Sequence, residues 1–233
     1  MSVTISRTSR TEPPRKKIAV LIDGSAVYSA SRSPEVGLRG AEDRRLNYFS
    51  LTEVLIRRVK GLTQATPSDD SSLWTMWTSA APANTGQANF LEFTEQRLKW
   101  QVRRVLPRDA LMIEPAALFI PTDASTTILR LSRFDASISF AMGRLADTHQ
   151  IVVVSDSYPL FEPLRRINER WEQERGKCFV AFFGHSMENR WGVAFKDQHA
   201  PEFINLDDSE AELFGIEKKE VTKPLEKSST QYY

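Results

Sequence analysis

Two hydrophobic patterns alternate along the chain. Short continuous apolar runs rich in β-branched residues are typical of strands covered on both faces. Between them, apolar residues recur every three or four positions, as on one face of a helix. The runs that predict strands are residues 18–22, 72–80, 150–156, 177–185 and a short piece at 202–208. Strands alternating with helices predict an α/β fold with a mostly parallel central sheet and helices on both faces, a three-layer α/β/α arrangement.

Four stretches show the helical period: residues 46–62, a charged stretch at 90–106, residues 134–147, and the segment from Leu160 to about Gly176. The chain between 107 and 130 has no clear period, and its apolar part at 110–120 fits either one strand or two short pieces. In the second predicted strand, Trp74 and Trp77 face opposite sides. This favours packing on both faces of the sheet over a single platform for stacking bases.

A length of 233 residues suits one domain with polar ends. Residues 1–15 are expected to be a basic flexible arm and residues 16–206 the folded domain. Residues 207–233 are expected to be a polar tail, either disordered or a docking segment for a protein partner.

Composition limits the classes of function. The formal charge is only +1, so charge gives no overall argument for nucleic-acid or membrane binding. The single cysteine, Cys178, lies in an apolar run; it predicts a buried thiol and excludes a disulfide framework within the chain. No run approaches the ~20 apolar residues of a membrane span, and the first residues lack the apolar segment of a secretory signal. We therefore expect a cytoplasmic protein with no membrane contact.

Carboxylates stand at equivalent places along the pattern. Asp23 ends the first predicted strand, Asp156 ends the third, and Asp135 lies in the first turn of a helix. Sites in parallel α/β folds form at the carboxyl ends of strands, so these three side chains are expected to converge. Like charges that converge favour a cation between them, and oxygen ligands suit Mg²⁺ or Mn²⁺, which can activate water for phosphodiester hydrolysis.

Neighbouring side chains supply candidate contacts to such a substrate. The hydroxyls beside the acids belong to Ser25, Ser155 and Ser157, and the basic pair nearest to Asp156 in sequence is Arg165 and Arg166. The alternative interpretation is purely structural. The aspartates would then be turn or capping residues, and the arginines would lie on a solvated helix face.

Taken together, these segments resemble the NYN domains of the PIN-like nuclease superfamily. The resemblance covers roughly residues 16–206, and its order and spacing are its most specific feature. It is carried by KKIAVLIDGSAVY, RLNYFSLTEVL, WTMWTSA followed by FLEFTEQRLKWQVRRV, RFDASISFAMGRLAD and IVVVSDSYPLFEPLRRI. It implies a metal-dependent ribonuclease with Asp23, Asp135 and Asp156 as metal ligands and catalytic residues, Mg²⁺ or Mn²⁺ as cofactor and RNA as substrate.

The acidic set is smaller than the family's usual one. Ala26 stands where the family often has Asn, Ala141 where it usually has a further Asp, and SDSYPLF supplies a single acid. The resemblance therefore implies either a ribonuclease with a reduced acidic site or a weak or inactive module that binds RNA or a protein partner. The sequence leaves two questions open. One is whether the substrate is RNA or DNA, and the other is the oligomeric state, for which a homo-oligomer is one possibility.

Overall fold

The computed structural model describes residues 17–31, 45–63, 73–105, 117–120, 127–130, 132–171 and 178–215. Within these ranges, six strands form one all-parallel sheet in the order β3-β2-β1-β6-β7-β8. The strands are β1 (Lys17–Asp23), β2 (Leu73–Ala80), β3 (Gln101–Val105), β6 (His149–Val154), β7 (Phe179–Phe182) and β8 (Glu202–Asn205). The predicted parallel α/β fold is confirmed.

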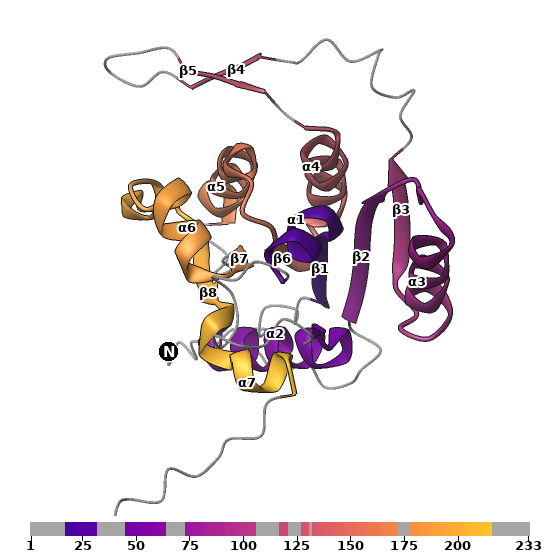
Figure 1. The fold of residues 1–233 in the computed structure, drawn as a ribbon. Coiled ribbons are helices and arrows are strands. Elements are labelled where there is room, and N and C mark those ends of the chain that lie inside the picture. The colour runs from indigo at the N-terminus through magenta and orange to yellow at the C-terminus, as the bar shows by residue number, and fades with distance from the viewer. Residues whose placement is uncertain are drawn as a thin grey trace, which may run out of the picture.

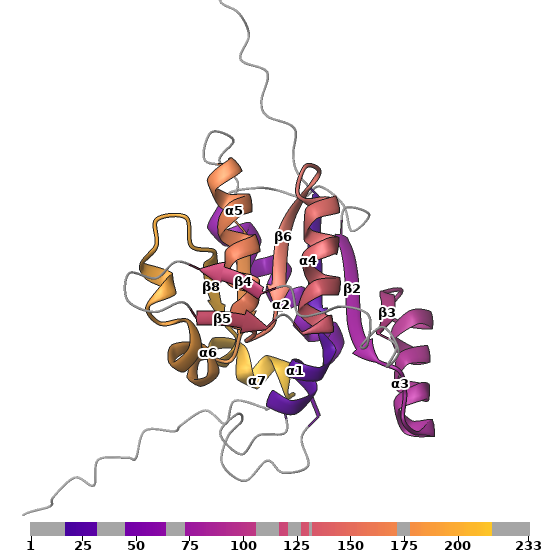
Figure 2. The same ribbon diagram turned by 90° about the horizontal axis from the view of Figure 1, so that it is seen from above.

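Helices cover both faces of this sheet. Figure 1 shows α4 (Arg133–Leu145) and α5 (Phe161–Trp171) on one side and α2 (Tyr48–Thr63) and α7 (Glu210–Leu213) on the other. Seen from above, α4 and α5 lie side by side along the strands (Figure 2). The remaining helices of the described chain are α1 (Gly24–Ala30), α3 (Thr85–Gln96) and α6 (Gly184–Trp191), with short 3₁₀ turns η3 (Tyr158–Leu160), η4 (Ala194–Lys196) and η5 (Leu206–Ser209).

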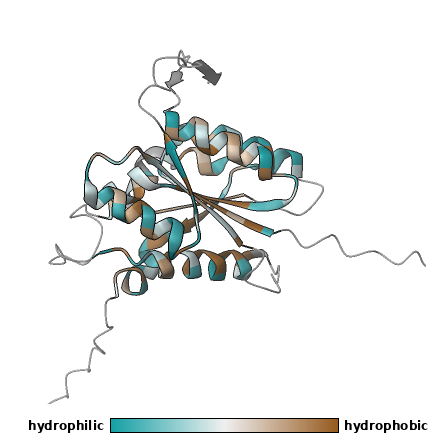
Figure 3. Cartoon of the chain, turned by 90° about the vertical axis from the view of Figure 1, so that its right-hand side faces the viewer, coloured by the Kyte–Doolittle hydropathy of each residue, from teal (hydrophilic) through white to brown (hydrophobic). Residues whose placement is uncertain are grey.

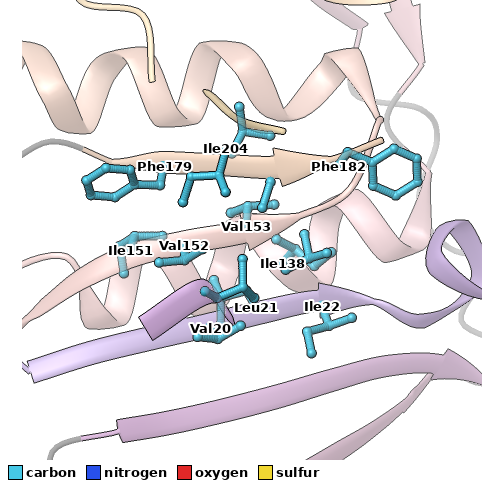
Figure 4. Packing of buried hydrophobic residues seen from close by; sticks show 14 of the residues in the cluster. Val20, Leu21, Ile22, Ile138, Ile151, Val152, Val153, Phe179, Phe182 and Ile204 are labelled. Carbon is cyan, nitrogen blue, oxygen red and sulfur yellow. The ribbon is translucent and has the colours of Figure 1, made fainter. Parts of the chain in front are cut away.

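The core lies on both faces of the central strands. In β1, residues 18–22 are at most 3% exposed, and residues 151–154 of β6 are fully buried. Figure 4 shows side chains of β1, β6 and β7 packed together with Ile138 of α4. The strands form a hydrophobic centre between helices whose outer faces are hydrophilic (Figure 3). Burial on both faces explains why these strands are continuous apolar runs rather than alternating ones.

One predicted helix is wrong in its second half. The segment at 90–106 is not a single helix, because α3 ends at Gln96 and β3 begins at Gln101. Lys99 has a φ of 58°, which turns the chain between them. Since β3 pairs only with β2, it is an edge strand with a largely polar sequence, QVRRV. Val102 and Val105 of β3 follow Leu98 at helical spacing. The apolar periodicity therefore continues into β3, although the backbone there is no longer helical.

Several short helices and strands were not predicted from the sequence pattern. An antiparallel pair, β4 (Ala117–Ile120) and β5 (Thr127–Arg130), lies in the stretch that had no clear period. The apolar residues before 117 lie outside the described residues, as do residues 121–126 and 1–16. Helices α1, α6 and α7 are each too short to give a helical period.

The folded part of the chain extends beyond residue 206. The polar tail was predicted to start at 207, yet η5 and α7 occupy this segment, and Leu213 is fully buried. The Arg57 guanidinium of α2 donates two hydrogen bonds to the Glu212 carboxylate at 3.0 and 2.6 Å. Residues 216–233 lie outside the described part. No helix among the described residues is both long and apolar enough to cross a membrane.

Candidate active site at the carboxyl edge of the sheet

The strand order places a switch point beside β1. From β1 the chain builds β2 and β3 on one side, and it later returns to build β6, β7 and β8 on the other. In doubly wound sheets, ligands bind outside the carboxyl ends of the strands at the place where the order reverses. Here that place lies between Asp23, the last residue of β1, and Ser155–Asp156, which follow β6.

Strand register puts three polar side chains in one row. Asp23 pairs with Thr78 of β2, and the pairing of Ile22 with Val154 places Ser155 beside Asp23 on the other side. Paired residues in a parallel sheet point to the same face, and successive residues point to opposite faces. The row therefore faces away from Trp77, which contacts Tyr48 of α2. It faces the layer that contains α4.

Asp23 is a buried carboxylate whose two oxygens make different contacts. It is 6% exposed. Its Oδ1 accepts hydrogen bonds from the backbone N–H groups of Ser25 and Ala26, each at 3.0 Å, and thereby caps α1. Within the described part of the chain, its Oδ2 accepts only a long 3.4 Å hydrogen bond from the Ser155 hydroxyl. One oxygen is thus committed to the helix, and the other is weakly engaged.

Burial raises the pKa of the Asp23 carboxyl above its ordinary value. The hydrogen bonds from the α1 backbone lower this pKa, whereas the charges of Asp135 and Asp156 raise it further. Asp135 and Asp156 therefore both lie close enough to repel the Asp23 carboxylate. Their convergence on one edge, expected from the sequence, agrees with this electrostatic coupling.

Asp135 adds to this edge of the sheet a carboxylate oxygen that has no hydrogen-bond partner among the described residues. It is 2% exposed and forms a capping box with Ser132, whose N–H donates to Asp135 Oδ2 at 2.9 Å. Its Oδ1 is buried and accepts no hydrogen bond from the described residues. Leaving a buried acceptor unsatisfied costs about 1–3 kcal/mol, and more for a charged group. A bound cation would relieve this cost.

Two hydroxyl groups nearby were not anticipated. Thr78, in the row beside Asp23, is fully buried, and Ser139 lies one turn along α4 from Asp135. Neither Oγ1 of Thr78 nor Oγ of Ser139 has a hydrogen-bond partner in the described chain. The sequence contains Thr78 at the end of an apolar strand, but only the order β2-β1-β6 shows that it adjoins Asp23.

Asp156 lies at the rim of this edge. Its side chain is half-buried, and its backbone carbonyl accepts a hydrogen bond from Trp191 Nε1 at 3.1 Å. The Ser157 N–H donates to the Ser155 hydroxyl at 3.1 Å, so these two residues fix the turn that carries Asp156. Since Ser155 is fully buried, its hydroxyl can orient Asp23 but cannot reach a substrate.

The two predicted phosphate-binding arginines are paired with acids of their own helix. Arg165 donates to both oxygens of Glu162 at 2.9 and 3.0 Å. Arg166 donates to Glu162 at 2.7 Å and to Glu169 at 3.3 Å. Hydrogen bonding from Arg165 lowers the pKa of Glu162, which therefore stays ionised near neutral pH. These ion pairs neutralise most of the positive charge that was expected to meet a phosphate.

The carboxylate oxygens of this site are of the ligand type that Mg²⁺ and Mn²⁺ prefer. No group of three or more His, Cys, Asp or Glu side chains among the described residues is arranged to hold a metal ion. However, Mg²⁺ commonly uses one or two carboxylates and completes its shell with water and substrate phosphate. Asp23 Oδ2 accepts one long hydrogen bond, and Asp135 Oδ1 accepts none from the described residues. These two oxygens have the chemistry that a hydrated Mg²⁺ or Mn²⁺ requires of its protein ligands.

The start of α1 is unsuited to a phosphate. In dinucleotide-binding folds the first helix binds pyrophosphate at its N-terminus, and glycines let the backbone approach it. Here the Asp23 carboxylate already accepts the first N–H groups of α1. Gly24 serves packing instead, because a Cβ at this position would lie 2.3 Å from Trp77 Cε2. This edge thus favours a cation over a dinucleotide.

A pocket of about 480 Å³ lies on the α2 side of the same edge. Gly24 and Ser25, the two residues after Asp23, form part of its wall, and Ser25 is exposed there. The three carboxylates do not line it. We call it the aromatic pocket, after its lining residues Tyr28, Tyr48, Trp77 and Phe90. The sequence pattern did not predict this pocket, because its walls come from four separate elements.

Comparisons with family models, with curated proteins and with solved structures found no match to this chain. The described residues form a parallel α/β fold with six parallel strands, and this fold class does not by itself specify a function.

Proposed function

We propose that this protein is a metal-dependent endoribonuclease of the NYN kind, which hydrolyses RNA phosphodiester bonds at Asp23, Asp135 and Asp156. The observation that carries the proposal is the unsatisfied, buried Oδ1 of Asp135 beside the buried Asp23 carboxylate at the switch point of the sheet. Capping alone does not require this arrangement. An Asn or Ser at position 23 would cap α1 about as well without burying a charge.

Each acid has a distinct role in the proposed reaction. A divalent cation, when bound, would activate water and neutralise charge on the phosphate. Asp23 and Asp135 would hold it through their weakly engaged oxygens, and the α1 amides and the Ser155 hydroxyl fix the orientation of Asp23. Asp156 is the half-buried member at the rim of the edge, and we assign it to positioning the attacking water.

A second candidate is a catalytically weak or inactive module of the same fold that binds RNA or a protein. It is supported by the finding that no three or more His, Cys, Asp or Glu side chains among the described residues are arranged to hold a metal ion. It is also supported by the pairing of Arg165 and Arg166 with glutamates, which leaves little positive charge beside Asp156. The two candidates differ in one measurable property, namely hydrolysis that depends on a divalent metal.

A cleavage assay separates them. Single-stranded and structured RNA are incubated with wild-type protein, Asp23→Asn or Asp135→Asn, in Mg²⁺, Mn²⁺ or EDTA. We expect cleavage by the wild type only with metal, and a loss on the order of 100-fold or more in either variant, since a bound metal supplies several kcal/mol. Asp147→Asn is the matched control, because Asp147 is exposed and pairs with Arg170 outside the site.

Equal cleavage by all four proteins would remove the proposed site. No cleavage by the wild type, together with intact RNA binding, would favour the binding module. A DNA substrate of the same sequence, run in parallel, tests whether the 2′-hydroxyl is needed.

A further inference from the structure

The aromatic pocket has a size and a position that suit a ligand. Its volume of about 480 Å³ lies within the range of small-molecule sites, which span roughly 300–1,000 Å³. It is formed by α1, the start of α2, the end of β2 and the first half of α3. Because Gly24 and Ser25 line it, the pocket begins one residue from the Asp23 carboxylate.

The pocket's aromatic rings form a preorganised wall. The Tyr48 ring contacts Trp77 edge to face at 5.4 Å between centroids and Phe90 at 5.0 Å. Phe90 in turn contacts Trp77 at 5.3 Å. Trp77 is 2% exposed and is held against Gly24, which leaves no room for a Cβ. On α1, by contrast, Tyr28 lines the pocket with 45% of its surface exposed.

Polar groups occur at the other side of the pocket. Asn84 Oδ1 accepts the Gln87 N–H at 2.9 Å, and Gln87 Oε1 accepts the Ala83 N–H at 2.7 Å. These bonds fix both side chains with their amide nitrogens left as donors, and neither nitrogen has an acceptor among the described residues. Arg45 also lines the pocket, and no ion pair joins it to the described chain.

Aromatic side chains, amide groups that can pair with a polar ring edge, and one cation together match a nucleobase with its phosphate. Single-stranded RNA is recognised in this way, by stacking of unpaired bases on aromatic side chains and by hydrogen bonds to their edges. We propose that the aromatic pocket binds an unpaired nucleobase of an RNA strand whose neighbouring phosphate lies at the acidic edge. This inference rests on the proposed function, since the acidic edge is what places RNA there.

The test measures binding separately from cleavage. A fluorescently labelled single-stranded RNA octamer is titrated in EDTA against wild type, Tyr28→Ala, Gly86→Phe and Phe140→Ala. Tyr28→Ala removes an exposed wall, and Gly86→Phe fills the pocket from the first turn of α3, where a Cβ has only an ordinary contact. Phe140 is the matched control, because it is an aromatic residue that is 67% exposed on α4 and does not line the pocket.

We expect Tyr28→Ala and Gly86→Phe to weaken octamer binding by roughly 5- to 100-fold, the range for losing one stacked base. Phe140→Ala should bind as the wild type does. The same titration with abasic octamers, each lacking one base, should identify a position at which Tyr28→Ala has no further effect.

Wild-type affinity in both pocket variants would overturn the proposal, as would equal weakening by Phe140→Ala. Binding of a free nucleoside monophosphate as tightly as the octamer would overturn the assignment to RNA and leave a nucleotide site. Failure of the proposed function has a different signature, because the wild type would then bind the octamer through the pocket without cleaving RNA in Mg²⁺ or Mn²⁺.

Discussion

Replacing Asp23 by Asn separates the cost of the buried charge from the value of the cap. The Asn side-chain oxygen can accept the same N–H groups of Ser25 and Ala26, which now lie 3.0 Å from Oδ1. The substitution removes a charge that is 6% exposed and that Asp135 and Asp156 repel. We therefore predict that Asp23→Asn is more stable than the wild type at neutral pH in EDTA. The expected gain is about 1 kcal/mol, the size common for relief of a strained functional site.

Asp23→Ala provides the matched comparison. Alanine removes the same charge, but it also removes the cap, and this loss typically costs about 1 kcal/mol. The Asn variant should thus exceed the Ala variant by about that amount. For a chain of this length, the difference corresponds to roughly 2–4 °C in Tm. Thermal and urea unfolding of the three proteins in EDTA measure both differences.

The pH dependence gives an internal check. Because burial and neighbouring charges raise the pKa of Asp23, the folded chain binds this proton more tightly than the unfolded chain does. The wild type is therefore penalised at neutral pH and recovers as the pH falls through the raised pKa. The advantage of Asp23→Asn should be full at neutral pH and should fade in acid. An Asn variant that is less stable than the wild type at neutral pH would refute the reasoning.

Other substitutions test the packing around the site. Gly24→Ala should destabilise the fold by about 1–3 kcal/mol, because its Cβ would meet an indole ring at 2.3 Å. Gly143→Ala should instead stabilise the fold by about 0.5–1 kcal/mol, because an added Cβ would have no atom within 4 Å. Urea unfolding of both variants compares them, and equal effects on stability would contradict this account of the packing. Leu213→Ala should cost about 2–5 kcal/mol, since this side chain is fully buried, and an unchanged urea midpoint would mean that α7 is not part of the core. Glu162→Gln should lower stability at neutral pH but not in strong acid. Hydrogen bonding from Arg165 lowers the pKa of Glu162, so its contribution is present above its unfolded-state pKa and is lost as the pH falls through the folded one. Unfolding at a series of pH values measures this, and a pH-independent difference would contradict it.

Strong local patterns made most of the sheet predictable. Residues 18–22 and 150–155 are buried, so their apolar runs identified central strands, and the carboxylates of Asp23 and Asp156 directly after these runs marked the edge that the strand order later selected. Edge strands carry less of this information. The QVRRV segment of β3 has one neighbour and an exposed, polar face, so its spacing could not distinguish a strand from the end of a helix.

The site was predictable only in part, for a related reason. Asp23, Asp135 and Asp156 stand at recognisable positions in sequence, whereas Thr78 becomes adjacent to Asp23 only through the pairing of β1 with β2. The pairing of Arg165 with Glu162 is local. Sequence alone could not show, however, that Nε and Nη2 of Arg165 would face the carboxylate rather than a ligand. Non-local contacts of this kind depend on the fold.

The most direct test of the central claim is anomalous diffraction from crystals of the protein soaked in Mn²⁺. We predict a manganese peak at the carboxyl edge between β1 and β6, within roughly 2.0–2.2 Å of a carboxylate oxygen of Asp23 and of Asp135. The peak should be absent from crystals of Asp23→Asn treated in the same way. No peak at this edge in wild-type crystals, or an equal peak in both proteins, would contradict the account.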